Sequence, residues 1–461
     1  MTTLLPGDDE TIVAIATAPG RGAVALVRLS GARAIPIARA LGAFGRAAGA
    51  DVVPRRAQRA TLRDTAGVVM EDALVTAFVK PQSYTGEDVV ELAIHGGLVS
   101  PQRVLTACVA AGARLAQPGE FTRRAVLNGR MDLLQAEAVA DLVDARTQSM
   151  QQQALAQLDG GLSRRLLALR DEVIHLEALI AYDIDFPDED DGPIAPARIG
   201  NAARALLASL EALLDTVPRG AMVRDGVLIV IAGPPNAGKS SLFNALLGES
   251  RAIVTAVPGT TRDAIEALLD RPGGALPLRL VDTAGLRDTD DEVEKLGIEV
   301  SGRYLAQAQV VLACGASPDD VARTMEAVHD RTMATVIPVH TKWDLWEAEH
   351  ATAQVDSVMV SAESGAGLTD LLAHIDDTAQ RRAPDSSHDS VIITRERHRV
   401  GLTTARDELA EFVSVWISGA LPAPVAAVHL HTAREAIAEL IGSVETEEVL
   451  DRVFRDFCIG K

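Results

Sequence analysis

The chain has little of several features that mark whole classes of protein. Only three of its 461 residues are cysteines, and they lie far apart, without a Cys-x-x-Cys pair or a Cys/His cluster. This spacing predicts neither a disulfide framework nor a zinc site and fits a reducing compartment. We expect Cys108 and Cys314 to be core residues. No stretch approaches about 18 uninterrupted apolar residues, and the acidic N-terminus lacks the basic and apolar regions of a signal peptide. We therefore expect a soluble, cytoplasmic protein that has no contact with a membrane.

Positive charge is also scarce. The 44 Lys and Arg residues stand against 64 Asp and Glu residues, a formal net charge of −20. This balance excludes a protein whose whole surface coats nucleic acid. The first 125 residues, however, hold 14 basic and 11 acidic side chains, a net charge of +3. If RNA is a partner, we expect a local basic patch or another protein to hold most of its phosphates.

The patterns that are present divide the chain into segments. Residues 1–125 alternate short apolar runs with Gly/Pro breaks, which predicts a small α+β domain with helices around residues 34–41 and 100–111. Residues 126–225 and 384–461 carry long amphipathic stretches, and we expect them to form one all-α domain. The block between them, 226–383, alternates the apolar strands VLIVIAG, LRLVDTAG, VVLACG, TVIPVHT and VDSVMVSA with helix-like segments, which is typical of a parallel sheet covered by helices on both faces. The sequence thus predicts a multidomain chain with an inserted Ras-like α/β domain.

A phosphate-binding motif opens the central block. The run from Gly233 to Ser240 matches GxxxxGK[ST], directly after the strand VLIVIAG and before the helix SLFNALLG. Such a turn points backbone N–H groups at phosphate, Lys239 adds a positive charge, and the Ser240 hydroxyl suits Mg²⁺. The residues expected to contact the phosphates are Asn236, Ala237, Gly238, Lys239, Ser240 and Ser241.

Three further strand-end turns follow in the order that a GTPase requires. Asp282 in Asp-Thr-Ala-Gly is expected to point a carboxylate toward Mg²⁺ through a water molecule. Asp344 in Thr-Lys-Trp-Asp can accept from guanine N1–H and N2–H₂, an edge that adenine lacks, although GTPases usually carry Asn where this chain has Thr341. We therefore expect GTP. The alternative of an ATP-dependent P-loop enzyme is tested by nucleotide selectivity, and equal binding of GTP and ATP would exclude this role of Asp344. The nucleotide-contacting residues predicted here are Asp282, Thr283, Ala284, Gly285, Thr341, Lys342, Asp344, Ser361 and Ala362.

The residue after Asp-Thr-Ala-Gly departs from the Ras-like pattern. It is Leu286, where Ras-like switches carry a Gln that orients the attacking water. Another group must therefore orient the water. The acidic candidates nearby are Asp288, Asp290, Asp291, Glu292 and Glu294.

Long motifs over nearly the whole chain resemble the MnmE (TrmE) family of tRNA-modification GTPases. They are TAPGRGAVALVRLSG, SYTGEDVVELAIHGG, QPGEFTRRAVLNGRMDLLQAEAVADLVDA, IDFPDED, GPPNAGKSSLFNALLG, TAVPGTTRD, DTAGLRDTDDEVEKLGIE and the terminal CIGK. The resemblance implies a homodimer that joins an FAD-dependent MnmG-type partner in a heterotetramer, with FAD on the partner only. The complex would add a carboxymethylaminomethyl or aminomethyl group to C5 of the tRNA wobble uridine, while GTP hydrolysis opens and closes the G domains.

The resemblance also implies K⁺-dependent hydrolysis without an arginine finger. The positions that match the family's K⁺ ligands are Asn236, Thr255, Val257 and Thr260. Thr261 matches the switch threonine that joins Ser240 on Mg²⁺, and Thr255, Thr260 and Thr261 also adjoin the nucleotide. Glu294 matches the water-orienting glutamate and, with Lys239, is a catalytic candidate.

For the N-terminal domain, the resemblance implies a bound 5,10-methylene- or 5-formyl-tetrahydrofolate. The matching positions are Arg28, Glu91, Arg130 and Lys461, although the family commonly has Lys at position 130. Arg28 and Lys461 suit the folate carboxylates, and Glu91 suits the pterin N–H edge. Cys458, in the terminal signature, lies by resemblance near the folate, and its chemical role stays open.

The main alternative is a regulatory GTPase of the ribosome-assembly kind with RNA-binding appendages. Such a GTPase would not require Glu91, Cys458 or Lys461. These residues therefore discriminate between the two functions.

Overall fold

The structure is a computed structural model that divides into two compact units. Unit 1 comprises Met1–Ala140, Leu158–Leu167 and Ala438–Lys461, and unit 2 comprises Asp141–Gln157 and Ala168–Ile437. Within the described part of the chain, no helix is long and apolar enough to cross a membrane. The described residues are 9–44, 52–185, 195–249, 251–253, 265–271, 276–282, 302–345, 357–382, 391–442, 453–454, 457 and 460.

Unit 1 is built on a six-stranded sheet with the order β3-β4-β5-β2-β1-β6. Its described neighbouring strands pair antiparallel except β1 with β6. Burial alternates along β2, so Val27 and Leu29 face the core while Arg28 lies on the opposite face. The strands are β1 (Ile12–Ile15), β2 (Val24–Ser30), β3 (Gln58–Arg63), β4 (Val69–Phe78), β5 (Val89–His95) and β6 (Arg114–Leu115).

Two helices cover the apolar face of this sheet. They are α1 (Ala34–Ala40) and α2 (Ser100–Ala110), close to the helices expected from the sequence. Their buried side chains, including Ile37 and the free Cys108, join one core with strand residues such as Leu92. Cys108 is therefore a small apolar filler of the core, as expected from the sequence.

The chain then enters α3 (Glu120–Leu127) through a glycine that the packing requires. Gly119 has φ +67°, and a Cβ there would lie 2.9 Å from Cβ of Phe457 and 3.0 Å from Cδ1 of Phe454. Phe454 and Phe457 also pack with Leu133 at the start of α4 (Leu133–Asp144). Residues near the C-terminus are thus part of the core of unit 1.

Unit 2 contains a seven-stranded sheet with the order β13-β12-β11-β7-β10-β9-β8. The pairs from β13 to β10 are parallel, and β9 pairs antiparallel with both neighbours. The expected strand at VDSVMVSA is reduced to two residues, β13. The strands are β7 (Val227–Ala232), β8 (Arg251–Ile253), β9 (Ile265–Asp270), β10 (Leu278–Asp282), β11 (Val310–Gly315), β12 (Thr335–His340) and β13 (Val358–Met359).

Both faces of this sheet are covered, as its apolar strands predicted. Alternate residues of β7 enter two different cores: Ile229 packs with α9 (Lys239–Glu249) and α12 (Leu368–Arg382), and Val230 packs with α11 (Pro318–His329). This is the Ras-like arrangement of a parallel sheet between helical layers.

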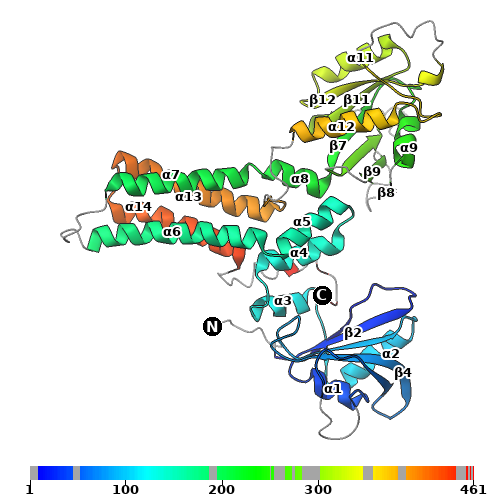
Figure 1. Ribbon diagram of the computed structural model, residues 1–461, viewed down its shortest axis with the longest axis vertical. Helices are drawn as coiled ribbons and strands as arrows, with labels where there is room; N and C mark the ends of the chain where they lie inside the picture. Colours follow the sequence, from blue (N-terminus) through cyan, green and yellow to red (C-terminus); the bar gives the residue numbers. More distant parts are fainter. Residues whose placement is uncertain are drawn as a thin grey trace, which may run out of the picture. The chain divides into compact units, whose positions relative to one another are not determined.

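Helices from both sides of this sheet domain in the sequence pack together in unit 2. Figure 1 shows α7 (Pro196–Leu214) beside α13 (Glu396–Ser418), and Trp416 Nε1 donates to the carbonyl oxygen of Pro196 at 3.0 Å. Arg434 of α14 pairs with Glu177 of α6 at 3.1 Å. The remaining helices are α5 (Gln148–Leu158), α6 (Gly161–Asp185), α8 (Val217–Asp225), α14 (Ala423–Ile441) and the short 3₁₀ helix η2 (Trp343–Leu345).

Candidate functional site

The phosphate loop joins β7 to α9, as the motif predicted. A Cβ at Gly233 would lie 2.4 Å from the carbonyl oxygen of Cys314 on β11, so only glycine fits where the loop passes this strand. Asn236 and Gly238 have φ of 62° and 78°, in the left-handed region. Ser240 lies exposed in the first turn of α9. A loop of this conformation at a helix N-terminus is a cradle for phosphate.

Two buried charges lie beside this loop. Nζ of Lys239, the first residue of α9, donates to the carbonyl oxygens of Gly233 at 3.1 Å and Pro234 at 2.9 Å. Asp282 ends β10, and its register partner on β7 is Ile231, two residues before Gly233. The positive and the negative group thus flank the same turn.

Both charges act on the pKa of the buried Cys314 thiol. Burial raises its pKa to about 12; Lys239 opposes this rise and Asp282 adds to it. Cys314 is a free, fully buried core residue, as expected from the sequence.

The turn that was expected to recognise the base is joined directly to the phosphate loop. The Thr341 hydroxyl lies 2.6 Å from the carbonyl oxygen of Ala237 and 3.0 Å from that of Gly315, and it donates to this pair. The backbone N–H of Thr341 also donates to Gly315 at 2.9 Å. The hydroxyl explains how threonine serves at a position where GTPases usually carry asparagine: it supplies the donor that connects the two loops.

Asp344 is held by the next strand end. It lies exposed in η2, and its Oδ1 accepts from the Ser361 hydroxyl at 2.5 Å. Ser361 is fully buried, and the N–H of Trp343 donates to the Val360 carbonyl at 3.1 Å. Ser361, predicted to support the base, therefore orients the carboxylate of Asp344, while Ala362 and Lys342 lie half-buried beside it.

Several predicted site residues lie outside the described residues. Ser240, Asp282 and Asn236 are the described side chains assigned to Mg²⁺ or K⁺, and oxygen atoms are the ligands that Mg²⁺ prefers. Among the described residues, no group of three or more His, Cys, Asp or Glu side chains could hold a metal ion. The predicted residues and acidic candidates outside the described ranges are Thr255, Val257, Thr260, Thr261, Thr283, Ala284, Gly285, Asp288, Asp290, Asp291, Glu292, Glu294, Cys458 and Lys461.

A second polar site lies on the sheet face of unit 1 opposite the core. Arg28 and Glu91 face each other in register on β2 and β5, and Nε and Nη2 of Arg28 lie 3.0 and 2.9 Å from Glu91 Oε1. The guanidinium carbon also lies 5.5 Å from the ring centroid of Tyr84 and 5.8 Å from that of Phe121. Nη1 points to the carbonyl oxygen of Gly460 at 3.4 Å. We call these five residues the Arg28 site.

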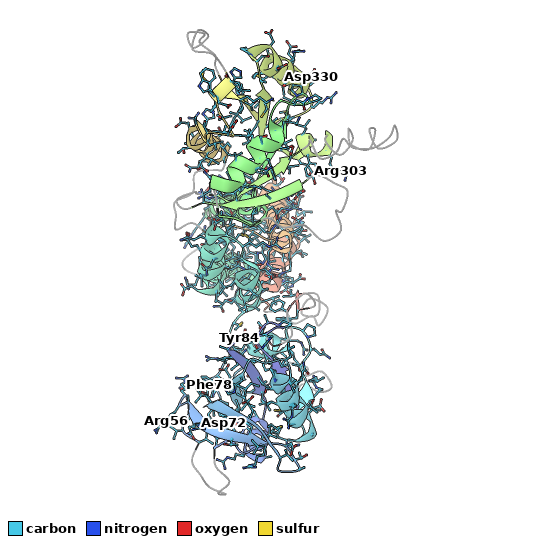
Figure 2. The ribbon with its side chains drawn as sticks, turned by 90° about the vertical axis from the view of Figure 1, so that its right-hand side faces the viewer. Arg56, Asp72, Phe78, Tyr84, Arg303 and Asp330 are labelled. Carbon is cyan, nitrogen blue, oxygen red and sulfur yellow. The ribbon has the colours of Figure 1, made fainter. Side chains whose placement is uncertain are left out.

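Arg28 and Glu91, which were expected to contact different parts of a ligand, also contact each other. They form one ion pair whose side chains are 18% and 25% exposed, so both remain within reach of a ligand. Arg130 lies outside the pair, and its Nε donates to the carbonyl oxygen of Ser83 at 3.1 Å. It thereby contacts the residue before Tyr84, which is labelled in Figure 2.

Tyr84, Phe121 and Gly460 were not among the residues predicted from the sequence. Aromatic residues make up only 3% of the chain, and Tyr84 and Phe121 both lie within polar motifs, SYTGED and PGEFTRR. An aromatic residue in a polar turn was thus an available signal. Burial raises the pKa of the Tyr84 hydroxyl, partly offset by its 2.8 Å hydrogen bond with Thr122 and by the Arg28 charge. The ring therefore packs under Arg28 as a neutral phenol.

Two family models together match almost all of the chain. The model of the TrmE N-terminus, described as that of a GTP-binding protein, matches residues 11–130, and the model of the MnmE helical domain matches residues 133–458. The chain belongs to the MnmE family. The resemblance carried by the sequence motifs is thereby confirmed.

Full-length relatives agree with this assignment. The tRNA modification GTPase MnmE of Moorella thermoacetica is 39% identical over 98% of this chain and 100% of that protein. The protein of the same name from Azoarcus sp. is 41% identical over 100% of both chains. That of Geobacter sulfurreducens is 40% identical over 98% of this chain and 99% of its own length.

Proposed function

We propose that this MnmE-family chain is a tRNA modification GTPase. GTP hydrolysis by its G domain drives the complex that adds a carboxymethylaminomethyl or aminomethyl group to C5 of the wobble uridine. The observation that carries this proposal is the 2.6 Å hydrogen bond from Thr341 to Ala237, which connects the base-recognition turn to the phosphate loop. It occurs in a chain that matches proteins named tRNA modification GTPase over its full length.

The residues of the nucleotide site have separate tasks in this function. The N–H groups of the phosphate loop bind the phosphates, Lys239 neutralises charge on them, and Asp344 accepts from the guanine edge. The restricted space at Gly233 and the left-handed Asn236 fit a loop that wraps closely around phosphate. Glu294, outside the described residues, would orient the attacking water.

Two cations complete the proposed site. Mg²⁺ would be held by Ser240 and Thr261 with Asp282 nearby, and K⁺ by Asn236, Thr255, Val257 and Thr260. When bound, these ions supply positive charge to the phosphate oxygens in the transition state.

We propose reduced folate as the ligand of the Arg28 site. An arginine between two aromatic rings and a carboxylate suits a ligand with a hydrogen-bonding pterin and anionic carboxylates. Arg28, Glu91 and Arg130 would bind 5,10-methylene- or 5-formyl-tetrahydrofolate with Lys461, and Cys458 belongs to the same terminal segment.

The domain organisation and assembly follow from the same family. We propose an N-terminal domain of residues 1–125 and a G domain of residues 226–383 inserted between the two parts, 126–225 and 384–461, of a helical domain. The packing of α7 on α13 supports this division, and so does the helical-domain match, which continues on both sides of the G domain. We also propose a homodimer that binds an MnmG-type partner, which carries the FAD, in a heterotetramer that acts on tRNA.

The test is restoration of the modified nucleoside in cells that lack their own MnmE. We expect the chain to restore the modified wobble uridine, and Asp344→Ala to lose this activity, with tRNA nucleosides measured by mass spectrometry. Purified chain should hydrolyse GTP far faster than ATP, and faster in K⁺ than in Na⁺. Unmodified tRNA together with altered ribosome profiles would support the ribosome-assembly alternative instead.

A further inference from the structure

In unit 1, several charged side chains pair with one another next to the loop of residues 83–88, which lies between β4 and β5. Arg124 of α3 lies at its centre with 2% of its side chain exposed. Its Nη1 lies 3.3 and 3.2 Å from the two carboxylate oxygens of Glu87, and its Nη2 donates to Glu120 Oε1 at 2.9 Å. Arg114 donates to the same Glu120 carboxylate at 3.0 and 2.7 Å.

Such a network adds little stability compared with apolar residues of similar size, although removing one of its partners is costly. Removing charges from water costs several kcal/mol per ion, and well-packed apolar residues of similar size are often as stable or more stable. A guanidinium does, however, fix the geometry of its partners, because its donors form a rigid planar fork. Arg124 therefore contributes a defined spacing between the groups that it joins.

Those groups belong to two elements, the 83–88 loop and α3. Besides the pair between Arg124 and Glu87, the Tyr84 hydroxyl hydrogen-bonds the hydroxyl of Thr122 of α3 at 2.8 Å. Just after α3, Asn128 Nδ2 donates to the carbonyl oxygen of Thr85 at 2.7 Å. These bonds hold the 83–88 loop at a fixed position relative to α3.

The 83–88 loop also forms hydrogen bonds with Ser30 of β2. The Ser30 hydroxyl lies 2.6 Å from that of Thr85 and 2.7 Å from Glu87 Oε2. Ser30 is fully buried and lies two residues after Arg28 on the same strand. Glu87 therefore accepts both from Arg124 and from the strand that carries Arg28.

The two elements that Arg124 joins carry the two aromatic rings of the Arg28 site. Tyr84 comes from the 83–88 loop and Phe121 from α3, and the Arg28 guanidinium lies 5.5 and 5.8 Å from their ring centroids. A shift of the loop relative to α3 would change the distance between these rings.

We propose that Arg124 is a positioning residue for the Arg28 site. By joining Glu87 of the loop to Glu120 of α3, it sets the spacing of Tyr84 and Phe121 and thereby the direction in which the Arg28 guanidinium meets an anionic ligand. This inference rests on the proposed binding of reduced folate at Arg28.

The test compares binding of 5-formyltetrahydrofolate to the full chain and its Arg124→Lys variant by calorimetry. Lysine keeps the charge but cannot join two carboxylates with a planar fork, so we expect about tenfold weaker binding. Arg114→Lys is the matched control, because Arg114 donates to the same Glu120 carboxylate but lies on the edge strand β6, outside α3; its affinity should stay within about twofold of wild type.

A double-mutant cycle separates positioning from general damage. In a Tyr84→Leu background the ring to be positioned is absent, so Arg124→Lys should weaken binding by less than about twofold further. Hydrogen exchange in the free protein should be faster at residues 85–88 in both Arg124→Lys and Glu87→Gln. Glu87→Gln serves as the second variant should Arg124→Lys not fold.

The outcomes are distinguishable. Unchanged affinity in Arg124→Lys and Glu87→Gln, an equal loss in the Tyr84→Leu background, or unchanged exchange at 85–88 overturns the positioning role while leaving folate binding intact. If the wild-type chain itself does not bind 5-formyltetrahydrofolate, the folate proposal fails, and the positioning role fails with it.

Discussion

The nucleotide site and the Arg28 site are built in different ways. The first collects groups at the ends of neighbouring strands β7, β10, β11 and β12, and many of its contacts are to backbone carbonyls. The second collects side chains from β2, β5, the 83–88 loop and α3, held by ion pairs and aromatic rings. A site built on the backbone tolerates an exchange of side chain such as Thr341, provided that the donor is kept. A site built from paired side chains depends on each partner.

The largest expected effect is the loss of the positive charge of Lys239, which the backbone of the nucleotide site cannot supply. Lys239→Ala should lower GTP hydrolysis by about 100-fold or more, because no backbone N–H replaces an ammonium at the developing charge. Single-turnover hydrolysis measures this. Arg381→Ala on α12 is the control, since Arg381 is exposed and pairs with Asp377. A loss of less than about threefold in Lys239→Ala would contradict the assignment.

The next effect tests the backbone itself. Gly233→Ala should weaken GTP binding by about tenfold or more, because the new Cβ would lie 2.4 Å from the Cys314 carbonyl oxygen and the loop must shift. Gly248→Ala in α9 is the matched control: its Cβ meets no atom within 4 Å, so affinity should stay the same. Titration with a fluorescent GTP analogue measures the affinity of both variants. Equal affinities would show that the close approach at Gly233 does not matter for GTP binding.

A smaller effect is expected where one side chain joins the two nucleotide loops. Thr341→Val leaves the buried carbonyl of Ala237 without this donor, at a cost of about 1–3 kcal/mol, so GTP affinity should fall by about tenfold. Thr341→Ser keeps the hydroxyl and should bind within about threefold of wild type. If valine and serine behave alike, the hydroxyl is not the connection between the loops.

The smallest effect is the pH dependence that Glu120 gives to the stability of unit 1. Burial alone would raise the pKa of Glu120, but hydrogen bonds from Arg114 and Gln117 and the charge of Arg124 outweigh it and lower this pKa. Ionised Glu120 therefore stabilises unit 1 at any pH above its pKa in the unfolded chain, and this stability is lost as the pH falls through the lower, folded pKa.

Thermal unfolding between neutral and acid pH tests this sign. Glu120→Gln should lower the melting temperature at neutral pH and should make unit 1 less sensitive to acid than wild type. A variant that loses as much stability in acid as wild type would show that other carboxylates cause the acid sensitivity.

Local patterns in the sequence determined much of this protein. The strand-loop-helix around Gly233 was predictable because its eight residues are contiguous and their spacing is imposed by the phosphate that they surround. The helices α1 and α2 and the apolar strands of both sheets were predictable for a similar reason, since periodicity within one element shows which side is buried. The family followed from motifs of this local kind.

Only the tertiary structure decided the contacts between distant segments. Arg28 and Glu91 are 63 residues apart, and Arg28 and Gly460 are 432 apart, so strand order and register had to be known before they could be paired. The antiparallel direction of β9 and the burial of Arg124 between two carboxylates were equally invisible. The physical reason is that sequence periodicity reports how one element is buried, whereas the partner across the interface is chosen by the packing of the whole unit.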